Sequence, residues 1–559
     1  YSKNEEEIKK NQYMIMLDLD KKGLENMLKK SMPLEDISDI TGLSIEEINE
    51  LRKNWNLSFS LHFLLVFFLF TFYLMHKYCI IFIRIGDNMN KTKMIATIGP
   101  SSKSKETIKQ MILSGVDVIR INMSHSTFEE ARDVILKIRD LNRELSVITG
   151  IMIDTRGPEI RITELEKNKI KLEAGNTIRI VKNNIKGNES MISLTLPEAI
   201  NYIKIGEKIL LNDGNVILEV LSNSSDALIC EIKNDGYIKS NCSVNVPNAN
   251  FNLKFLSEYD RETVKFAVLM QVDYLALSHV KDQLDVLDIN DLLIELSDDH
   301  IQIISKIENK SAMEEMKGIL KVSDGVMIAR GDLGIELEIE KIPSVQKKIA
   351  SYAKETEKIC IIATEMLSTM MDNPRPTRAE VSDVANAVLD GTDAVMLSSE
   401  TAIGKYPIET VNTMNKIIDE IEKEINYNDL LLEFNRKDKT DIPTAIAYST
   451  VDSANRINAS AIVCSTMSGS TAKKISHFRP SAPVIAISPI EKTVSGLTIN
   501  YGIIPVKVPM LDSTDEIIEK SREVALEQMN LSKNSKIVIA GSLPFNVDYT
   551  NFVKIEEIK

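Results

Sequence analysis

The stretch "SDGVMIARGDLG", residues 323–334, joins a short apolar run to two charged side chains. The apolar part has the length and composition of a buried strand. Arg330, Gly331 and Asp332 then follow at the point where the strand would end. Asp and Gly are also common turn residues, so an ordinary turn explains the stretch when it is taken alone. The other strands of the chain decide between the two interpretations.

Seven further apolar runs show the same pattern and alternate with amphipathic helical stretches. This alternation predicts a parallel sheet built from βα units, and eight such units close a (β/α)8 TIM barrel. The predicted strands are 94–98, 117–122, 149–154, 273–278, 301–307, 323–329, 358–363 and 393–398. The fold class is therefore α/β.

The 559 residues are enough for three or four domains. We expect the barrel to comprise residues 89–158 and 251–430. Residues 159–250, rich in Ile, Val, Asn and Gly with short alternating runs, predict an inserted all-β domain that overhangs the barrel mouth as a lid. A polar linker (435–443) then leads to a predicted C-terminal α/β domain over 444–559.

Composition excludes some functions. A net charge of −14 argues against a surface that binds nucleic acid over the whole molecule. The five cysteines show no paired spacing, which is typical of a reducing cytosol. The six histidines form no metal-ligand pattern either, so any metal here is a hard cation bound by oxygen.

Chemistry in a barrel of this kind sits at the carboxyl ends of its strands. Glu308 and Asp332 follow neighbouring strands, where they could share one Mg²⁺ ion. Lys306 and Arg120 suit an anionic, phosphorylated substrate. Polar side chains follow six of the eight predicted strands: Arg120, Asn122, Ser124, Asp154, Thr155, Arg156, Lys306, Glu308, Arg330, Asp332, Thr364, Ser398 and Glu400.

A second group of oxygen donors contains only one carboxylate and therefore suits a monovalent cation better than Mg²⁺. Its members are Asn122, Ser124, Asp154 and Thr155. Because the mouth has no nucleophilic Cys and no Ser–His pair, it favours phosphoryl transfer by positioning and charge stabilisation. Aldol or enol chemistry on a phosphorylated substrate would use similar groups, and the spacing leaves both open.

At these residues the chain resembles the pyruvate kinase family, from about Met89 to the C-terminus. The segments that carry the resemblance are "TKMIATIGPSS" (92–102), "VIRINMSH" (118–125), "DTRGPEIR" (154–161), "IQIISKIEN" (301–309), "ARGDLG" (329–334), "NPRPTRAEVSDVANAVLDGTDAVMLSSET" (373–401) and "YTN" (549–551). The resemblance implies transfer of the phosphoryl group of phosphoenolpyruvate to ADP, giving pyruvate and ATP, with Mg²⁺ and K⁺ as cofactors.

The resemblance also implies roles for individual residues. Arg120 contacts the phosphoryl group and the nucleotide, and His125 lies on the nucleotide side. Lys306 stabilises the phosphoryl group during transfer. Thr364 lies where the enolpyruvate is protonated. In the family these are the catalytic and substrate-binding groups.

Two cation sites are implied in the same way. Glu308 and Asp332 would hold Mg²⁺, while Gly331 and Asp332 present backbone N–H groups to the substrate carboxylate. Glu159 is the carboxylate that accompanies potassium dependence in the family. The residues that match the potassium ligands are Asn122, Ser124, Asp154 and Thr155.

The sequence departs from the family at three places near the site, His279, Glu365 and Ser399, each of which could alter affinity or lid closure.

In the C-terminal domain, "STMSGSTA" (465–472) follows a predicted strand and opens a helix. The corresponding family loop grips a sugar-phosphate activator, but an ordinary helix N-cap explains the pattern equally well. The candidate contacts are Thr466, Ser468, Gly469, Ser470 and Thr471. "SLPFNVDYTN" (542–551) lacks the Arg and Trp that grip fructose bisphosphate in some members, so the effector stays open; a homotetramer is expected.

Two rival functions differ in what they require. A mutase or lyase barrel that handles phosphoenolpyruvate would need neither ADP nor a lid, and would leave 159–250 unexplained. A membrane-tethered binding protein that has lost activity would lack catalytic groups, yet Lys306, Glu308, Asp332 and Arg120 are all present.

The region before the barrel, residues 1–88, is predicted to lie outside the working enzyme. Residues 1–56 resemble the tail of transposase-like recombination nucleases or form a solvated helical hairpin. The run "LSFSLHFLLVFFLFTFYLM" (57–75) is long enough and apolar enough to cross a bilayer. Its composition is nevertheless that of translated AT-rich DNA, and Met89 lies five residues before the first predicted strand. We therefore expect a cytoplasmic enzyme that begins at Met89.

Overall fold

The computed structural model describes residues 90–247, 254–298, 300–434, 441–529, 531–542 and 549–558. The expectations for 1–56, 57–75 and a start at Met89 lie outside these residues, as does most of the predicted linker. Within the described ranges, no helix is both long enough and apolar enough to span a membrane.

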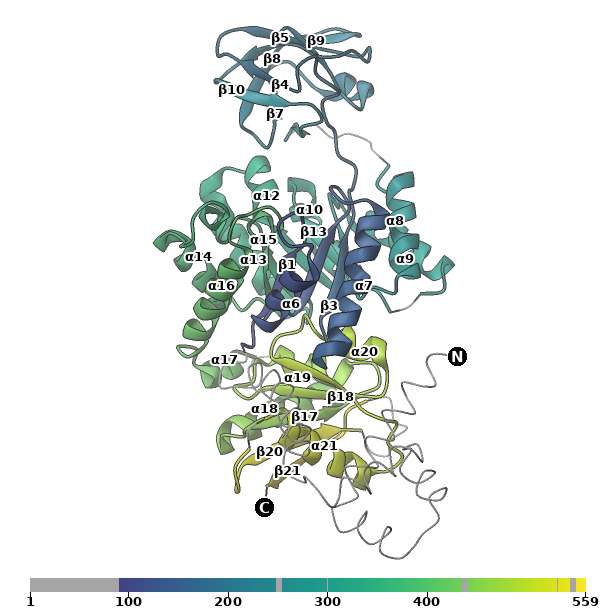
Figure 1. Ribbon diagram of the computed structural model, residues 1–559, viewed down its shortest axis with the longest axis vertical. Coiled ribbons are helices and arrows are strands. Elements are labelled where there is room, and N and C mark those ends of the chain that lie inside the picture. The colour runs from purple at the N-terminus through teal and green to yellow at the C-terminus, as the bar shows by residue number, and fades with distance from the viewer. Residues whose placement is uncertain are drawn as a thin grey trace, which may run out of the picture. The chain divides into compact units, whose positions relative to one another are not determined.

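Eight parallel strands form a closed barrel in the order β1-β16-β15-β14-β13-β12-β3-β2. Figure 1 labels three of them, β1, β3 and β13. The strands are β1 (Lys93–Thr97), β2 (Val118–Asn122), β3 (Gly150–Asp154), β12 (Tyr274–Leu277), β13 (Gln302–Ile307), β14 (Gly325–Ala329), β15 (Ile359–Ala363) and β16 (Ala394–Leu397). Nearly every strand residue is buried, because side chains fill the barrel interior and helices cover its outside. The predicted barrel is confirmed.

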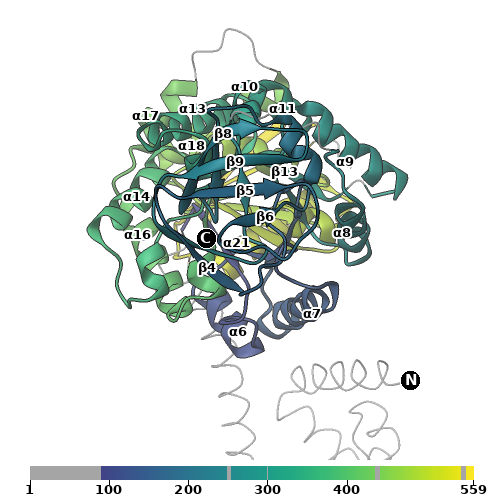
Figure 2. The same ribbon diagram turned by 90° about the horizontal axis from the view of Figure 1, so that it is seen from above.

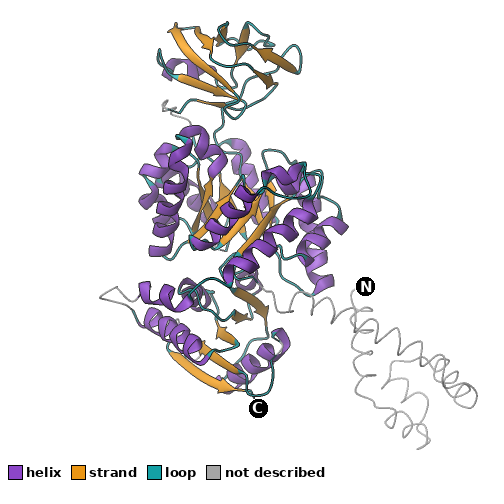
Figure 3. Ribbon diagram, turned by 90° about the vertical axis from the view of Figure 1, so that its left-hand side faces the viewer, coloured by secondary structure: helices purple, strands orange, loops and turns teal. Residues whose placement is uncertain are grey.

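Helices surround these strands, as the purple ribbons around the orange arrows in Figure 3 show. Two of them begin with a capping box, Thr127 with Glu130 and Thr377 with Glu380, which satisfies the free N–H groups of the first turn. The helices are α6 (Lys105–Leu113), α7 (Phe128–Leu145), α8 (Glu258–Leu269), α9 (Gln283–Glu295), α10 (Lys310–Glu314), α11 (Met316–Val322), α12 (Arg330–Glu336), α13 (Ile342–Glu355), α14 (Arg378–Leu389), α15 (Ser399–Ala402), α16 (Pro407–Glu422) and α17 (Tyr427–Phe434).

The segment between β3 and β12 forms two small sheets of its own. One has six strands in the order β11-β7-β8-β9-β5-β6, and the other pairs β10 with β4. Figure 2 shows β8, β9 and β5 side by side. The strands are β4 (Lys169–Leu172), β5 (Thr177–Val181), β6 (Met191–Ser193), β7 (Lys208–Leu211), β8 (Val216–Asn223), β9 (Ala227–Ile232), β10 (Gly236–Lys239) and β11 (Val244–Asn245). Alternating side chains of these strands form a separate apolar core.

The C-terminal region contains a five-stranded sheet in the order β19-β18-β17-β20-β21, with apolar clusters on both faces. Its elements are α18 (Ile442–Ile457), β17 (Ala461–Ser465), α19 (Ser470–His477), β18 (Val484–Ser488), α20 (Glu491–Ser495), β19 (Ile503–Lys507), α21 (Thr514–Gln528), β20 (Lys536–Gly541) and β21 (Phe552–Glu557). The α/β class is as predicted, but the antiparallel strand β21 was not foreseen.

Polar contacts join this region to the amino ends of the barrel strands. Gln302 Nε2 at the start of β13 donates to the carbonyl oxygen of Gly496 at 2.6 Å. The Tyr274 hydroxyl lies 3.1 Å from Thr498 Oγ1 and accepts the backbone N–H of Ile499 at 3.2 Å. Because these hydrogen bonds are buried, losing one of them would leave a polar group without a partner, and they therefore favour this one packing of the two regions.

Candidate active site

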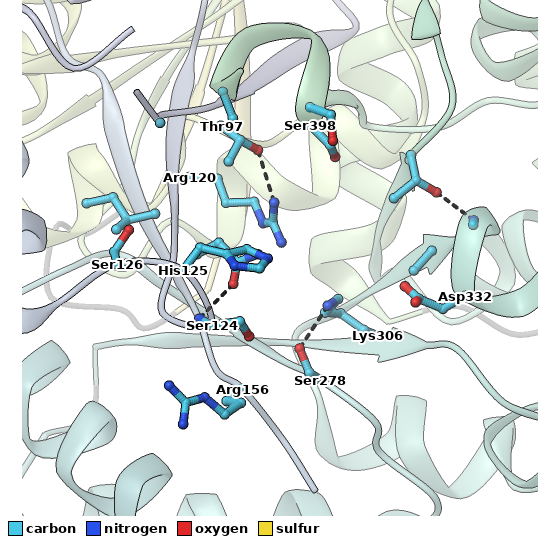
Figure 4. Close-up of a pocket in the computed structure, with 18 of the residues that line it drawn as sticks. Thr97, Arg120, Ser124, His125, Ser126, Arg156, Ser278, Lys306, Asp332 and Ser398 are labelled. Carbon is cyan, nitrogen blue, oxygen red and sulfur yellow. Dashed lines mark hydrogen bonds between the residues drawn. The ribbon is translucent and has the colours of Figure 1, made fainter. Parts of the chain in front are cut away.

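The carboxyl ends of the barrel strands open into a cleft of about 760 Å³. Figure 4 shows Arg120, Lys306 and Asp332 in this cleft. The predicted residues that line it are Arg120, Asn122, Ser124, His125, Lys306, Glu308, Gly331, Asp332 and Thr364. Glu159, His279, Glu365 and Ser399 line it as well. Asp154 and Thr155 are instead buried beneath it, with 1% and 3% of their surface exposed.

Arg120 is held by buried side chains at the end of β2. Its Nε donates to Asp154 Oδ2 at 2.6 Å, and its Nη1 donates to Thr97 Oγ1 at 3.0 Å. Asp154 stands on the neighbouring strand β3, in register with Asn122. The guanidinium is therefore fixed in direction before any substrate binds.

Lys306, on β13, is the centre of a second buried network. Its Nζ lies 2.7 Å from Glu308 Oε1, 2.8 Å from Ser278 Oγ and 3.4 Å from Asp154 Oδ1. Ser278 also hydrogen-bonds Asp154 Oδ1 at 2.9 Å and the carbonyl oxygen of Thr155 at 2.7 Å. Sequence reasoning missed Ser278, because a serine at the end of a strand gives no signal beyond its position.

In this network, burial and the neighbouring charges shift the pKa values of Lys306 and Glu308 in opposite directions. Burial alone would lower the pKa of Lys306, but the Asp154 and Glu308 carboxylates outweigh it and hold that pKa above its usual value. Burial likewise acts to raise the pKa of Glu308, yet the Lys306 ammonium keeps it low. Both groups are therefore charged at neutral pH.

Asp332 behaves differently although it lies beside the same groups. Burial, followed by the neighbouring Glu308 carboxylate, raises the pKa of Asp332 well above its usual range. Two carboxyl groups that repel each other in this way offer the oxygen donors and the negative charge that a divalent cation prefers. Within the described ranges, no cluster of three or more His, Cys, Asp or Glu side chains offers a larger metal site.

Most oxygen atoms of the predicted monovalent-cation site already accept hydrogen bonds from other groups of the protein. Asn122 Oδ1 accepts the backbone N–H of Ser124 at 3.0 Å. The carbonyl of Thr155 and both oxygens of Asp154 already accept hydrogen bonds. Glu159 forms an ion pair with Arg161 at 2.7 Å. Each oxygen keeps a lone pair that could bind a weakly held ion. Asp154 and Thr155, however, are almost fully buried rather than open to the cleft.

Arg330 does not line the cleft, although Gly331 and Asp332 beside it do. Its Nη1 binds both oxygens of Asp383 at 2.7 and 2.6 Å, and its Nη2 donates to the carbonyl of Thr364 at 2.8 Å. The RGD stretch is also the first turn of α12 rather than an isolated turn. Hydrogen bonds to both oxygens of a carboxylate stabilise a guanidinium more than contact with water in the cleft does.

Thr364 and Glu365 have left-handed backbones, with φ of 66° and 54°. Such values are uncommon outside glycine and asparagine, and they cluster at functional sites. The backbone N–H of Gly331 donates to Thr364 Oγ1 at 2.8 Å, which in turn donates to the carbonyl of Ala363 at 2.6 Å. In this state the Gly331 amide that would meet a substrate carboxylate is bonded to the threonine hydroxyl.

His125 and His279 both line the cleft, after β2 and β12 respectively. Burial and the nearby Arg161 lower the pKa of His125, so its imidazole is neutral at pH 7. His279 is a departure from the family pattern, and its backbone N–H donates to Glu308 Oε2 at 2.6 Å. The φ of His279 is 58°, so the loop after β12 is bent sharply toward Glu308.

The candidate effector loop follows β17 and opens α19. Thr466 Oγ1 accepts the backbone N–H of Gly469 at 2.9 Å, and Thr471 Oγ1 lies 2.5 Å from Thr550 Oγ1. Ser468 and Ser470 are exposed. No side chain caps α19, so the ordinary N-cap is absent here.

Comparisons with known proteins agree with this architecture. Residues 89–411 match the family "pyruvate kinase, barrel domain", and residues 444–556 match "pyruvate kinase, alpha/beta domain". A pyruvate kinase of Clostridium acetobutylicum is 39% identical over 473 residues, covering 84% of this chain and 100% of the relative. One of Staphylococcus aureus is 40% identical over 470 residues, covering 84% and 80%.

The crystal structure of a pyruvate kinase from Cryptosporidium parvum superposes with a TM-score of 0.79 at 34% identity, covering 84% of this chain and 97% of that one. The matched families begin at residue 89, so they lend no support to a nuclease-like role for residues 1–56. The matches also decide against the mutase and lyase alternatives. The chain belongs to the pyruvate kinase family, the phosphotransferases that convert phosphoenolpyruvate and ADP into pyruvate and ATP.

Proposed function

We propose that Lys306 and Arg120 perform this transfer in the cleft, with Mg²⁺ and K⁺ as cofactors. The observation that carries the proposal is the Lys306 ammonium, buried and held 2.7 Å from Glu308 Oε1 in the same cleft as Arg120. A fixed cation in a site that excludes water stabilises charge that develops on a transferring phosphoryl group.

Each residue has a task that follows from its position. Arg120, fixed by Asp154 and Thr97, binds phosphoryl oxygens without first having to be ordered. Lys306 faces the phosphoryl group between donor and acceptor. His125, being neutral, accepts or donates one hydrogen bond at the nucleotide without adding charge repulsion to the arginines around it.

Thr364 would act at the other end of the substrate. The substrate carboxylate takes the Gly331 N–H and thereby releases Thr364 Oγ1 from its present bond. This frees an acceptor lone pair on the hydroxyl, whose own proton is donated to the carbonyl of Ala363 at 2.6 Å. The O–H must therefore rotate away from Ala363 before its proton can pass to the carbon of the enolpyruvate. A hydroxyl group is too weak an acid to give up its proton unaided, so it must regain one from solvent as it donates.

Glu308 and Asp332 would hold Mg²⁺, since both line the cleft and their carboxylates repel each other when no cation lies between them. When bound, the ion supplies positive charge to the phosphoryl and carboxylate oxygens of the substrate. Asn122, Ser124, Asp154 and Thr155 would hold K⁺. The set fits an ion that binds weakly, because most of its oxygens already accept hydrogen bonds.

We also propose a cytoplasmic, homotetrameric enzyme with a sugar-phosphate effector at 466–471. The buried thiols of Cys230, Cys242, Cys360 and Cys464 are free, which suits a reducing compartment. Size-exclusion chromatography with light scattering tests the tetramer. Intact mass and fractionation of the native protein test the location, and recovery in a membrane fraction with residues 57–75 retained would contradict it.

The test of the cofactors is a pyruvate-forming assay with purified protein. We expect turnover to require phosphoenolpyruvate, ADP and Mg²⁺, and to fall steeply when tetramethylammonium replaces K⁺ at equal ionic strength. A panel of sugar phosphates in the same assay tests the effector. Turnover that persists after removal of all divalent cations would refute the Glu308–Asp332 assignment.

A further inference from the structure

A second polar pocket lies at the opposite end of the barrel, where the strands begin and the C-terminal region makes contact. Its volume is about 120 Å³. Asp324, Lys358 and Asp393 line it from the starts of β14, β15 and β16. A water needs roughly 10–15 Å³ by this measure, whereas drug-sized ligands need about 300 Å³ or more. The pocket therefore has room for a few waters or one small ion.

The C-terminal region contributes two buried side chains with unpartnered polar atoms. Arg479 is 6% exposed, and its Nη2 binds Asp393 Oδ1 at 3.1 Å, but its Nε has no hydrogen-bond partner. Asn500 is also 6% exposed, and its Oδ1 is unpartnered. Buried polar atoms are seldom left without a partner, so both indicate that something else is bound here.

Two lysines bring positive charge from opposite sides. Lys473, on α19, donates to Gln302 Oε1 at 2.7 Å, and Lys358 donates to the carbonyl of Ser323 at 2.6 Å. Both acceptors are neutral oxygens. Burial lowers the pKa of Lys473, with Asp324 opposing and Lys358 adding to the effect. The lysines repel each other and each keeps N–H groups for another acceptor.

Cationic side chains outnumber the carboxylates in the lining of this pocket. Asp393 pairs with Arg479, and Glu357 pairs with Lys474. The cations are Lys354, Lys358, Lys473 and Arg479, and the carboxylates are Asp324, Glu357 and Asp393. Together with the unpartnered Nε–H of Arg479, the lysines offer a donor set for an anion.

We propose that this pocket binds a small tetrahedral oxyanion, either inorganic phosphate or the phosphoryl group of a small metabolite. The anion would accept hydrogen bonds from Lys358, Lys473 and Arg479 Nε. The amide of Asn500, turned by 180°, would present its NH₂ group in place of the unpartnered oxygen. Because its donors come from both the barrel and the C-terminal region, the anion would tie the two together.

The position of Lys473 adds a consequence for regulation. α19 carries Lys473 and begins at Ser470, within the candidate effector loop. An anion held at Lys473 would therefore fix the helix whose first turn belongs to that loop. Phosphate in the pocket and a ligand at the loop would then influence each other's affinity.

The location is tested by soaking crystals of the full chain in selenate, a tetrahedral oxyanion with an anomalous signal. We expect a selenium peak within hydrogen-bond distance of Lys473, Lys358 and Arg479. Selenium peaks elsewhere, with none in this pocket, would overturn the proposal. This experiment uses the unaltered protein and so does not depend on any variant folding.

The solution test compares thermal unfolding in phosphate and in chloride at equal ionic strength. Lys473→Met removes one cation of the pocket, whereas Lys520→Met removes a lysine of α21 that pairs with Glu523 and does not line the pocket. We expect phosphate to raise the unfolding temperature of the wild type and of Lys520→Met, with binding to Lys473→Met weaker by about tenfold or more. An equal phosphate shift in all three proteins would overturn the proposal.

Two further arms complete the design. Lys358→Met removes a cation from the barrel side and should show the same loss if Lys473→Met does not fold. Glycerol 2-phosphate separates the sources of the oxyanion: stabilisation that Lys473→Met abolishes supports the phosphoryl group of a metabolite. Stabilisation by inorganic phosphate alone supports the free ion.

Discussion

Replacing Lys306 by methionine tests the centre of the proposed mechanism. Methionine has a similar length, so the change removes the charge while largely filling the same space. In the structure the ammonium is bonded to Glu308, Ser278 and Asp154 at 2.7, 2.8 and 3.4 Å. Those partners pre-orient the cation toward the cleft, where charge develops during transfer.

The magnitude follows from burial. Removing one pre-oriented donor that acts on the transition state costs about 3–4 kcal/mol, a 10²–10³-fold fall in kcat. Lys306 is 8% exposed and carries a full charge, so we expect an effect at or beyond the upper end of that range. Binding of phosphoenolpyruvate should weaken much less, because Arg120 and the Gly331 amide remain.

The assay separates turnover from binding and from folding. We would measure kcat at saturating substrate, phosphoenolpyruvate affinity by calorimetry, and folding by circular dichroism. Lys103→Met is a matched control, since Lys103 lines the same cleft but is exposed and screened by salt. A folded Lys306→Met variant with kcat within tenfold of the wild type would refute the role.

Three other predictions concern different groups. Glu159→Lys should remove the requirement for K⁺ because a fixed ammonium replaces the ion, whereas Glu159→Gln should not; unchanged dependence in an active Glu159→Lys variant would count against the monovalent site. Since burial and Glu308 raise the pKa of Asp332, protons compete with Mg²⁺, and the Mg²⁺ concentration for half-saturation should rise as pH falls from about 8 to about 6. A flat profile would argue against Asp332 as a ligand. Burial raises the pKa of the Cys230, Cys360 and Cys464 thiols to about 12, so Ellman's reagent should label them at neutral pH only after denaturation.

The barrel could be predicted because its strands are buried on both faces. Such strands are continuous apolar runs, and their periodic return is visible without any contact information. Every strand of the barrel begins and ends within two residues of its predicted range. The strand ends also bring together Lys306, Glu308 and Asp332, because parallel strands end at the same rim.

Side-chain direction could not be predicted in the same way. Arg330 and Asp332 are two residues apart, yet one binds Asp383 and the other faces the cleft. Ser278 bridges Asp154 and Lys306, although nothing in its neighbours along the chain distinguishes it from other serines. These outcomes depend on partners 28 to 124 residues away in the sequence, which local patterns do not contain.

Arg330 and Gly331 both contact Thr364, one through its carbonyl oxygen and the other through its hydroxyl. The left-handed backbones of Thr364 and Glu365 cost about 1–3 kcal/mol each, so the surrounding structure must offset them. Arg330 does so by donating to both of their carbonyls while Asp383 anchors it from α14. The strained turn then places Thr364 Oγ1 within 2.8 Å of the Gly331 nitrogen.

Glycine at position 331 is part of that arrangement. A Cβ added there would lie 3.4 Å from Thr364 Oγ1, at the edge of ordinary van der Waals contact. In the proposed mechanism the arginine thus supports the threonine that passes the proton, the glycine amide meets the substrate carboxylate, and the aspartate supplies an oxygen to Mg²⁺. In the sequence this stretch resembles an ordinary turn, but in the fold Arg330 holds the backbone of Thr364 and Glu365 in place beside the cleft.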